Sequence, residues 1–173
     1  MINPYIYQIF KIYAGDWNPE VILNDKLMIR QTGDRLYATI DSYKYYHLNN
    51  INLKDTSLDI KYVLALLNSK MMSAYYLLVT LEKERVMAQT DIETLEKLPI
   101  KEIEKEKQQP LIKLVDKMLS LNKRLNEIGD KKTDERAKIE EEIKKTDAEI
   151  DELVYKIYGI TEEEKKIIEE SMK

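Results

Sequence analysis

The C-terminal part of the chain carries two runs of mainly apolar residues in which spacings of three and four alternate. The first run consists of Leu111, Leu114, Met118, Leu121, Leu125 and Ile128, and the second of Ile139, Ile143, Thr146, Ile150, Leu153 and Ile157. Such spacing is typical of helices that pair along one apolar seam. Because only residues 129–133 separate the two seams, the sequence predicts an antiparallel coiled-coil hairpin.

Residues that favour helix ends flank both runs. Pro110 suits the first turn of the first helix, where its missing N–H costs nothing. Gly129 and Gly159 are expected to end the two helices, and Thr133 or Asp134 to cap the start of the second.

A third, short helix is predicted after Thr161, because the spacing from Thr161 to Glu164 fits a capping box. We expect this helix to pack back on its predecessor through the following residues: Ile167, Ile168, Tyr155 and Tyr158.

The residues before Pro110 are richer in aromatic side chains and predict an α+β domain. Residues 26–31, 35–41 and 45–53 are expected to form strands, with a turn at 32–34 and a break at Asn49-Asn50. From Asp59 the pattern changes to that of one helix, with an apolar face that runs as far as Leu78. An extended apolar segment at 95–100 closes this domain. We therefore predict a domain at 1–105 and a helical hairpin with a short C-terminal helix at 106–173.

The composition excludes several classes of site. The chain has no cysteine and a single histidine, His47, which rules out disulfides and thiolate metal sites and is compatible with a reducing cytoplasm. No apolar run is long enough for a membrane span, and residues 1–10 lack the pattern of a signal peptide. The net charge is −4, yet residues 26–54 hold five cations and two carboxylates, a local charge of +3. The five cations are Lys26, Arg30, Arg35, Lys44 and Lys54.

No catalytic motif is complete. Phosphate-binding glycine loops, the zinc motif HExxH and the nucleophile motif GxSxG are absent. Residues 3–5 and 18–20 superficially resemble the methyltransferase motif Asn/Asp-Pro-Pro-Tyr/Phe, but each lacks the second proline. Acidic pairs such as Glu82 with Glu84 are interpreted as solvated surface, because no third ligand accompanies them. The sequence therefore predicts no catalytic residue, metal site or cofactor site within this chain.

Two polar segments are candidates for contact with double-stranded DNA. Arginine and glutamine side chains can read guanine and adenine edges, while lysine and tyrosine can hold phosphates. The first segment offers Arg30, Gln31, Thr32, Arg35, Lys44, Tyr45, Tyr46 and His47, and the second offers Lys83, Arg85 and Gln89. The alternative is that these residues are ordinary core tyrosines and surface charges.

Four stretches carry a family resemblance. Residues 25–33 (DKLMIRQTG), 36–41 (LYATID), 58–70 (LDIKYVLALLNSK) and 92–100 (IETLEKLPI) resemble the TaqI-like C-terminal specificity domain. That domain ends type II DNA adenine-N6 methyltransferases and fused restriction–modification enzymes, and it is similar to the recognition domains of type I specificity subunits. The resemblance covers roughly residues 20–105, its most specific pieces being Leu-Leu-Asn-Ser-Lys and Leu-Pro-Ile, and the C-terminal hairpin is similar to the tail found in that family.

The resemblance implies a division of labour. The fold would be an irregular α+β domain with a small twisted sheet, and its role would be sequence-specific recognition of double-stranded DNA. An N-terminal methyltransferase domain of the same parent polypeptide, outside this chain, would bind S-adenosylmethionine, with Mg²⁺ as a further candidate, and would methylate a flipped adenine. We expect this chain to start within the linker before the specificity domain. The family's base-reading residues vary with the target, so none is carried over here.

Two other functions stay open. The helical hairpin could bind a protein partner or pair two copies of the chain, although a spacer or docking arm is the simpler interpretation. The chain could also be an enzyme in its own right, which direct methyltransferase and nuclease assays would decide.

Overall fold

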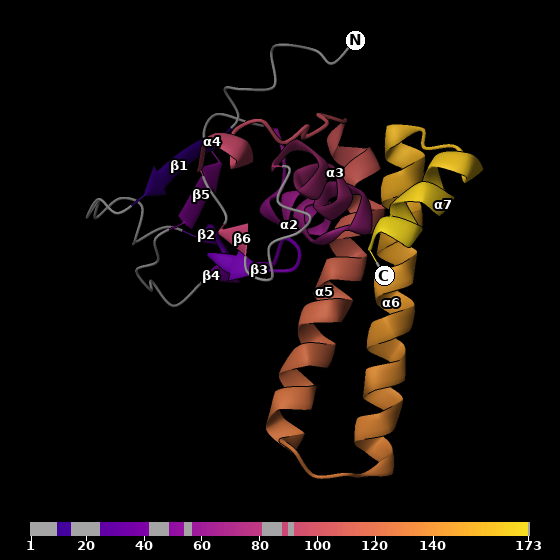
Figure 1. The fold of residues 1–173 in the computed structure, drawn as a ribbon. Helices are drawn as coiled ribbons and strands as arrows, with labels where there is room; N and C mark the ends of the chain where they lie inside the picture. Colours follow the sequence, from indigo (N-terminus) through magenta and orange to yellow (C-terminus); the bar gives the residue numbers. More distant parts are fainter. Residues whose placement is uncertain are drawn as a thin grey trace.

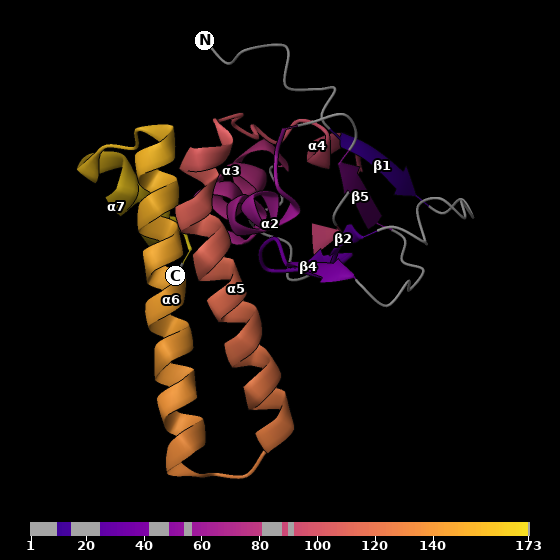
Figure 2. The same ribbon diagram turned by 180° about the vertical axis from the view of Figure 1, so that it is seen from behind.

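The computed structural model describes residues 10–14, 25–41, 49–53, 57–80, 88–89 and 92–172. These residues form an α+β fold in which an antiparallel sheet, a central pair of helices and a long helical hairpin follow one another across the molecule (Figure 1). A last helix lies on the side of the hairpin away from the sheet, as the view from behind also shows (Figure 2). The predicted fold class is therefore confirmed.

The sheet has four strands, in the order β1 (Phe10–Ala14), β5 (Asn49–Leu53), β2 (Lys26–Ile29) and β4 (Ala38–Asp41), and every neighbouring pair is antiparallel. The strands predicted at 26–31 and 35–41 are shorter than expected, because the chain leaves the four-stranded sheet between Ile29 and Ala38. The expected break at Asn49-Asn50 is wrong, since these residues pair with β1 and Asn50 also faces β2. The expected turn at 32–34 is also wrong in part, because β3 (Thr32–Gly33) pairs with β6 (Ala88–Gln89).

A buried ion pair crosses from β2 to β4. The ammonium of Lys26 donates to the carboxylate of Asp41, its partner in the strand register, and both side chains are almost completely shielded from solvent. Because water cannot stabilise either charge there, each depends on the other. Lys26 is therefore a core residue, and its charge, which was counted in the local sum of residues 26–54, is not available to a ligand.

The central helices are α2 (Ile60–Asn68) and α3 (Lys70–Thr80), and the single helix predicted from Asp59 is wrong. Asp59 does cap the start, accepting a hydrogen bond from the amide of Lys61 at 2.8 Å. Ser69, however, is extended, and the two helices meet at a bend of 63°. Beyond the bend Met71 is still buried, but Leu78, the last residue of the expected apolar face, is 72% exposed.

The hairpin consists of α5 (Lys105–Ile128) and α6 (Asp134–Tyr158) and runs antiparallel, as predicted. Its register can be followed in two ion pairs, Lys117 with Glu142 and Arg124 with Glu135. From one pair to the next, each helix advances by seven residues in opposite directions, the repeat expected of a paired seam. The predicted cap at Thr133 is confirmed, since its hydroxyl accepts from the amide of Arg136.

Pro110 lies inside α5 and not in its first turn, because the helix begins at Lys105. The proline removes one hydrogen bond to the carbonyl of Glu106. Both residues are exposed, so water can satisfy that carbonyl, and the helix continues through the proline.

The last helix, α7 (Glu162–Ser171), starts with the predicted capping box between Thr161 and Glu164. Ile168 packs against the core, whereas Ile167 is 67% exposed. Consecutive helical residues point about 100° apart, so one narrow contact with α3 cannot cover both side chains.

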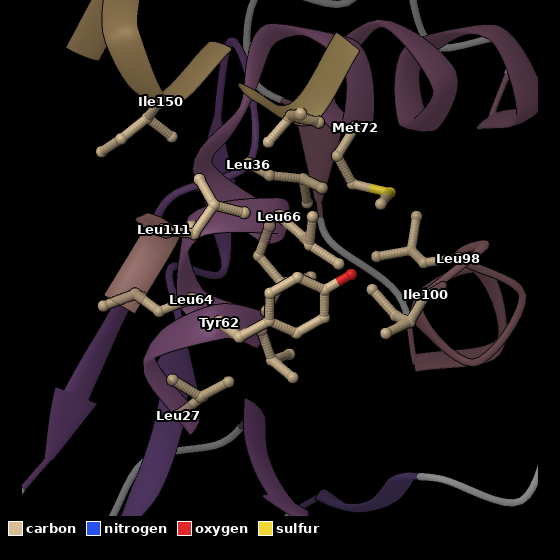
Figure 3. Close-up of a cluster of buried hydrophobic side chains, with 14 of the residues drawn as sticks. Leu27, Leu36, Tyr62, Leu64, Leu66, Met72, Leu98, Ile100, Leu111 and Ile150 are labelled. Atoms are coloured by element: carbon tan, nitrogen blue, oxygen red, sulfur yellow. The ribbon is translucent and has the colours of Figure 1, made fainter. Parts of the chain in front are cut away.

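The hydrophobic core continues from the sheet through the central helices into the base of the hairpin (Figure 3). Leu27 of β2, Tyr62 and Leu66 of α2, Leu111 of α5 and Ile150 of α6 belong to this one cluster. The segment that follows α4 (Ile92–Leu95) closes it with Leu98 and Ile100, as predicted, and the hydroxyl of Tyr62 donates to the carbonyl of Lys101. The hairpin is thus fixed at its base, while the proposed boundary at residue 105 stays a prediction.

In the described ranges no single helix is long and apolar enough to cross a membrane, although α2 and α3 together, bent by 63°, meet the same length and composition test.

The end of α6 makes a first prediction. Gly159 has a left-handed backbone with φ of 71°, and nothing lies where a side chain would project. We expect Gly159→Ala to lower the free energy of unfolding by about 1 kcal/mol, because only the backbone conformation is disfavoured. Gly159→Asn should lose less, since asparagine tolerates this conformation. Urea denaturation measures both variants, and equal losses would contradict the backbone explanation.

Candidate nucleic-acid interface

The chain between β2 and β4, residues 30–37, forms a short ordered loop that includes β3, and we call it the β2–β4 loop. The amide of Arg30 donates to the carbonyl of Tyr37 at 2.8 Å, which closes the two ends of the loop. Leu36 is 2% exposed and anchors the loop in the core. Gln31 and Thr32, which follow Arg30 in the loop, are half-buried, so part of each polar side chain is exposed.

Two guanidinium groups lie over one aromatic ring in this loop. The central carbons of Arg30 and Arg35 are 5.5 and 5.0 Å from the centroid of the Tyr37 ring. The Tyr37 hydroxyl donates to the carboxylate of Asp34 at 2.9 Å, and this hydrogen bond lowers the pKa of Asp34. The carboxylate therefore holds the ring, and the ring restricts both arginine side chains before any ligand arrives.

Gly33 allows the loop to pack closely. A side chain at this position would start 3.1 Å from the carbonyl oxygen of Arg35 and 3.2 Å from the Tyr37 ring. Since the first of these contacts is with the backbone, it could be relieved only by moving the loop.

The structure brings the two predicted segments together at one point. Thr32 of β3 lies opposite Gln89 of β6 in the strand register, although the two are far apart in sequence. Of the predicted contact residues, Arg30, Gln31, Thr32 and Arg35 lie on the β2–β4 loop. The other candidates, Lys44, Tyr45, Tyr46, His47, Lys83 and Arg85, fall outside the described residues.

The local charge of residues 26–54 stays at +3 when the buried Lys26 and Asp41 are left out. Lys26 and Asp41 neutralise each other in the core, so both leave the sum. Among residues 26–54 this leaves four cations, Arg30, Arg35, Lys44 and Lys54, against one carboxylate, Asp34, and the difference is still +3.

Asn68 holds the start of β4, directly after the β2–β4 loop, a role that the sequence analysis missed. Its side-chain oxygen accepts from the amide of Ala38 at 2.8 Å, and its side-chain nitrogen donates to the carbonyl of Ala38 at 3.0 Å. These two hydrogen bonds act like one rung of a sheet on the outer side of β4. Asn68 belongs to the Leu-Leu-Asn-Ser-Lys stretch that carries part of the family resemblance. Nothing in the sequence, however, indicates that its partner is Ala38, which lies 30 residues away.

The next two residues join the helices to the hairpin. The Ser69 hydroxyl donates to the carbonyl of Leu66 and accepts from the amide of Met72, so that it caps α3 where α2 ends. The amide of Lys70 donates to the carboxylate of Asp151 on α6 at 2.9 Å, and its ammonium lies 3.0 Å from the same carboxylate. The Asn-Ser-Lys stretch thus connects strand, helices and hairpin within three residues.

A groove of about 550 Å³ opens beside this junction. Its walls come from β4 with the end of the β2–β4 loop, from α2, and from the facing sides of α5 and α6. Apolar side chains line most of it, including Leu119, which is 39% exposed, while Arg35, Lys144 and Asp147 supply charge. Within the part of the chain that the structure describes, no three His, Cys, Asp or Glu side chains converge as metal ligands would.

The electrostatics of the groove link the loop to α6. Burial disfavours the charged form of Arg35, but Tyr37, Asp147 and Asp34 outweigh it and raise the pKa of Arg35. Burial and the carboxylate of Asp151 raise the pKa of Asp147, whereas Arg35 acts in the opposite direction. Arg35 and Asp147 are therefore near enough to influence each other's charge.

Comparison with known families supplies the remaining information. The model of the TaqI-like C-terminal specificity domain matches residues 4–100, which are more than half of the chain and include the sheet, the β2–β4 loop and both central helices. No curated protein and no solved structure gives a significant match. The chain therefore belongs to the family of TaqI-like C-terminal specificity domains, which recognise DNA sequence in restriction–modification systems.

Proposed function

We propose that this chain recognises a specific sequence of double-stranded DNA through the β2–β4 loop, on behalf of a DNA adenine-N6 methyltransferase. A methyltransferase domain of the same parent polypeptide would bind S-adenosylmethionine and flip the target adenine out of the duplex. The role of the present chain is to find the site and hold its orientation. It needs no catalytic group for that role.

The arrangement of Arg30 and Arg35 over Tyr37 is the observation that carries the proposal. Arginine offers paired donors to the guanine edge and also binds phosphate, and both contacts strengthen when the side chain is already ordered. Gln31 and Thr32 stand between the two arginines and add an amide and a hydroxyl of the kind that read bases.

Binding to duplex DNA with a randomised central region tests the function. Sequencing of the recovered duplexes should show one enriched motif, and titration of that duplex in rising salt should show a steep loss of affinity. Four cations of residues 26–54 remain when Lys26 is left out, namely Arg30, Arg35, Lys44 and Lys54. If each of them neutralises one phosphate, the slope of log K against log salt is expected to be about −3 to −4. Equal recovery of all sequences, or binding that ignores salt, would contradict the proposal.

Arg30 gives the sharpest single test. We expect Arg30→Ala to weaken binding to the enriched duplex by about 5-fold to 150-fold, the usual effect of losing a base-reading or ordered arginine. Lys166→Ala, which removes the same charge from exposed α7, is the matched control and should leave affinity nearly unchanged. If Arg30 reads a base, the variant loses preference at one position. If Arg30 holds a phosphate, the slope of log K against log salt becomes shallower by about 0.9.

The hairpin supports a second, independent role in binding a protein partner or a second copy of the chain. The outer part of α5 and α6 projects past the rest of the molecule (Figures 1 and 2), and Leu119 of α5, which lines the groove, keeps a partly exposed apolar side chain. Sedimentation of wild type and Leu119→Ser compares their oligomeric states without removing core residues. An identical distribution for both would favour the spacer interpretation.

A further inference from the structure

Arg35 is the charged residue of the β2–β4 loop that lines the groove between the sheet and the helical hairpin. It lies over Tyr37 on one side and lines the groove on the other, where Asp147 of α6 also contributes to the wall. Both side chains are half-buried, so the attraction between them is screened less than between exposed charges. Arg30, on the same ring, does not line this groove.

The walls of the groove are tied together by hydrogen bonds. Asn68 holds the start of β4 to the end of α2. Two residues later, Lys70 holds the start of α3 to Asp151, which lies one helical turn after Asp147 on α6. Ile150 of α6 and Leu36 of the loop belong to the same core cluster. These contacts fix α6 relative to the sheet, and they therefore also fix the position of Asp147 relative to Arg35.

From this geometry we propose that Asp147 is a positioning residue for DNA recognition, whose carboxylate orients the guanidinium of Arg35 so that the hairpin sets the direction in which this arginine meets the duplex. The inference rests on the function proposed above and deepens it. It distinguishes the two arginines of the loop, since Arg35 lines the groove together with Asp147 of α6 and Arg30 does not line it.

The cost of keeping Asp147 in place argues for a role other than stability. Because the pKa of Asp147 is raised above its ordinary value, its charged form is less favourable in the folded chain than in the unfolded chain. A raised carboxylate pKa reduces stability at pH values above it, and the loss disappears as the pH falls through that pKa. Asp147→Asn should therefore leave the midpoint of urea unfolding at pH 7 unchanged or higher. Residues kept against stability are common at functional sites.

The experiment uses the full chain and the enriched duplex, with a scrambled duplex of equal length as competitor. For Asp147→Asn we expect the ratio of specific to scrambled affinity to fall about fivefold to tenfold. Affinity for the scrambled duplex should hold or rise, because a negative charge has been removed. Glu141→Gln, an exposed residue on the same helix, is the matched control and should keep the wild-type ratio.

A double-mutant cycle shows whether Asp147 acts through Arg35. In an Arg35→Ala background, Asp147→Asn should no longer change the ratio, since the group that it orients is gone. An unchanged ratio in the single Asp147→Asn variant, or an equal drop with and without Arg35, overturns the positioning role while leaving the proposed function standing. If wild type itself shows no sequence preference, while its fold is intact by circular dichroism, both proposals fail.

Discussion

Asp41→Asn is expected to lower the free energy of unfolding by about 3–5 kcal/mol, because it removes the carboxylate that forms an ion pair with the buried ammonium of Lys26. The two side chains are 0% and 1% exposed and face each other across β2 and β4, so neither can turn toward water. Urea denaturation followed by far-ultraviolet circular dichroism measures the loss. Loss of this pair should also loosen β4, which follows the β2–β4 loop, and therefore weaken DNA binding.

The chain offers a control with the same chemical change. Asp116→Asn removes one partner of the Lys61–Asp116 ion pair, in which the side chains are 35% and 53% exposed. Such a pair contributes at most about 1 kcal/mol, because solvent screens it. The double variant Lys26→Met, Asp41→Leu should recover much of the stability, since it removes both charges together. If Asp41→Asn and Asp116→Asn cost the same, burial does not govern the strength of these pairs.

Leu36→Ala is expected to cost about 2–5 kcal/mol, the range for removing a large side chain from a packed core. Leu36 is 2% exposed and is the residue through which the β2–β4 loop enters the core cluster of Figure 3. Without this anchor, Arg30 and Arg35 lose their common support, so affinity for the enriched duplex should fall even under conditions in which the variant is folded.

Leu78→Ala is the matched substitution, because it removes the same atoms from a side chain that is 72% exposed. It should change the midpoint of urea unfolding little. A Leu36→Ala variant that is destabilised yet binds DNA with wild-type affinity when folded would show that the loop keeps its shape without its anchor.

The sequence predicts best where the signal is local. The seams of α5 and α6, the cap at Thr133 and the capping box at Thr161 depend on residues within one or two helical turns, and the structure confirms them. The single helix from Asp59 fails because Ser69 satisfies the backbone at the break through its own hydroxyl, and an apolar pattern alone does not reveal this competition. The prediction that the first hairpin helix starts at Pro110 is also wrong, because Pro110 is exposed and α5 continues through it.

The candidate site could be predicted in its residue types but not in its supports. Arg30 and Arg35 are recognisable from charge and position, whereas their shared ring, Tyr37, also reads as an ordinary strand residue. Asn68 and Asp147 act across distances in sequence that no periodicity spans. Lys26 shows the opposite error, because its partner, Asp41, was read as an independent charge until the register placed the two side by side.

The continuous core has a consequence for exchanging specificity between related proteins. A chimera cut at residue 105 would separate Leu111 and Val115 of α5 from the central helices that they cover, and would expose apolar surface on both products. A better junction lies past Asn122, the last residue of α5 that lines the groove, in the outer part of the hairpin that extends beyond the rest of the molecule (Figure 1). The transplantable unit is therefore the specificity domain together with the hairpin base, including Asp147 and Asp151.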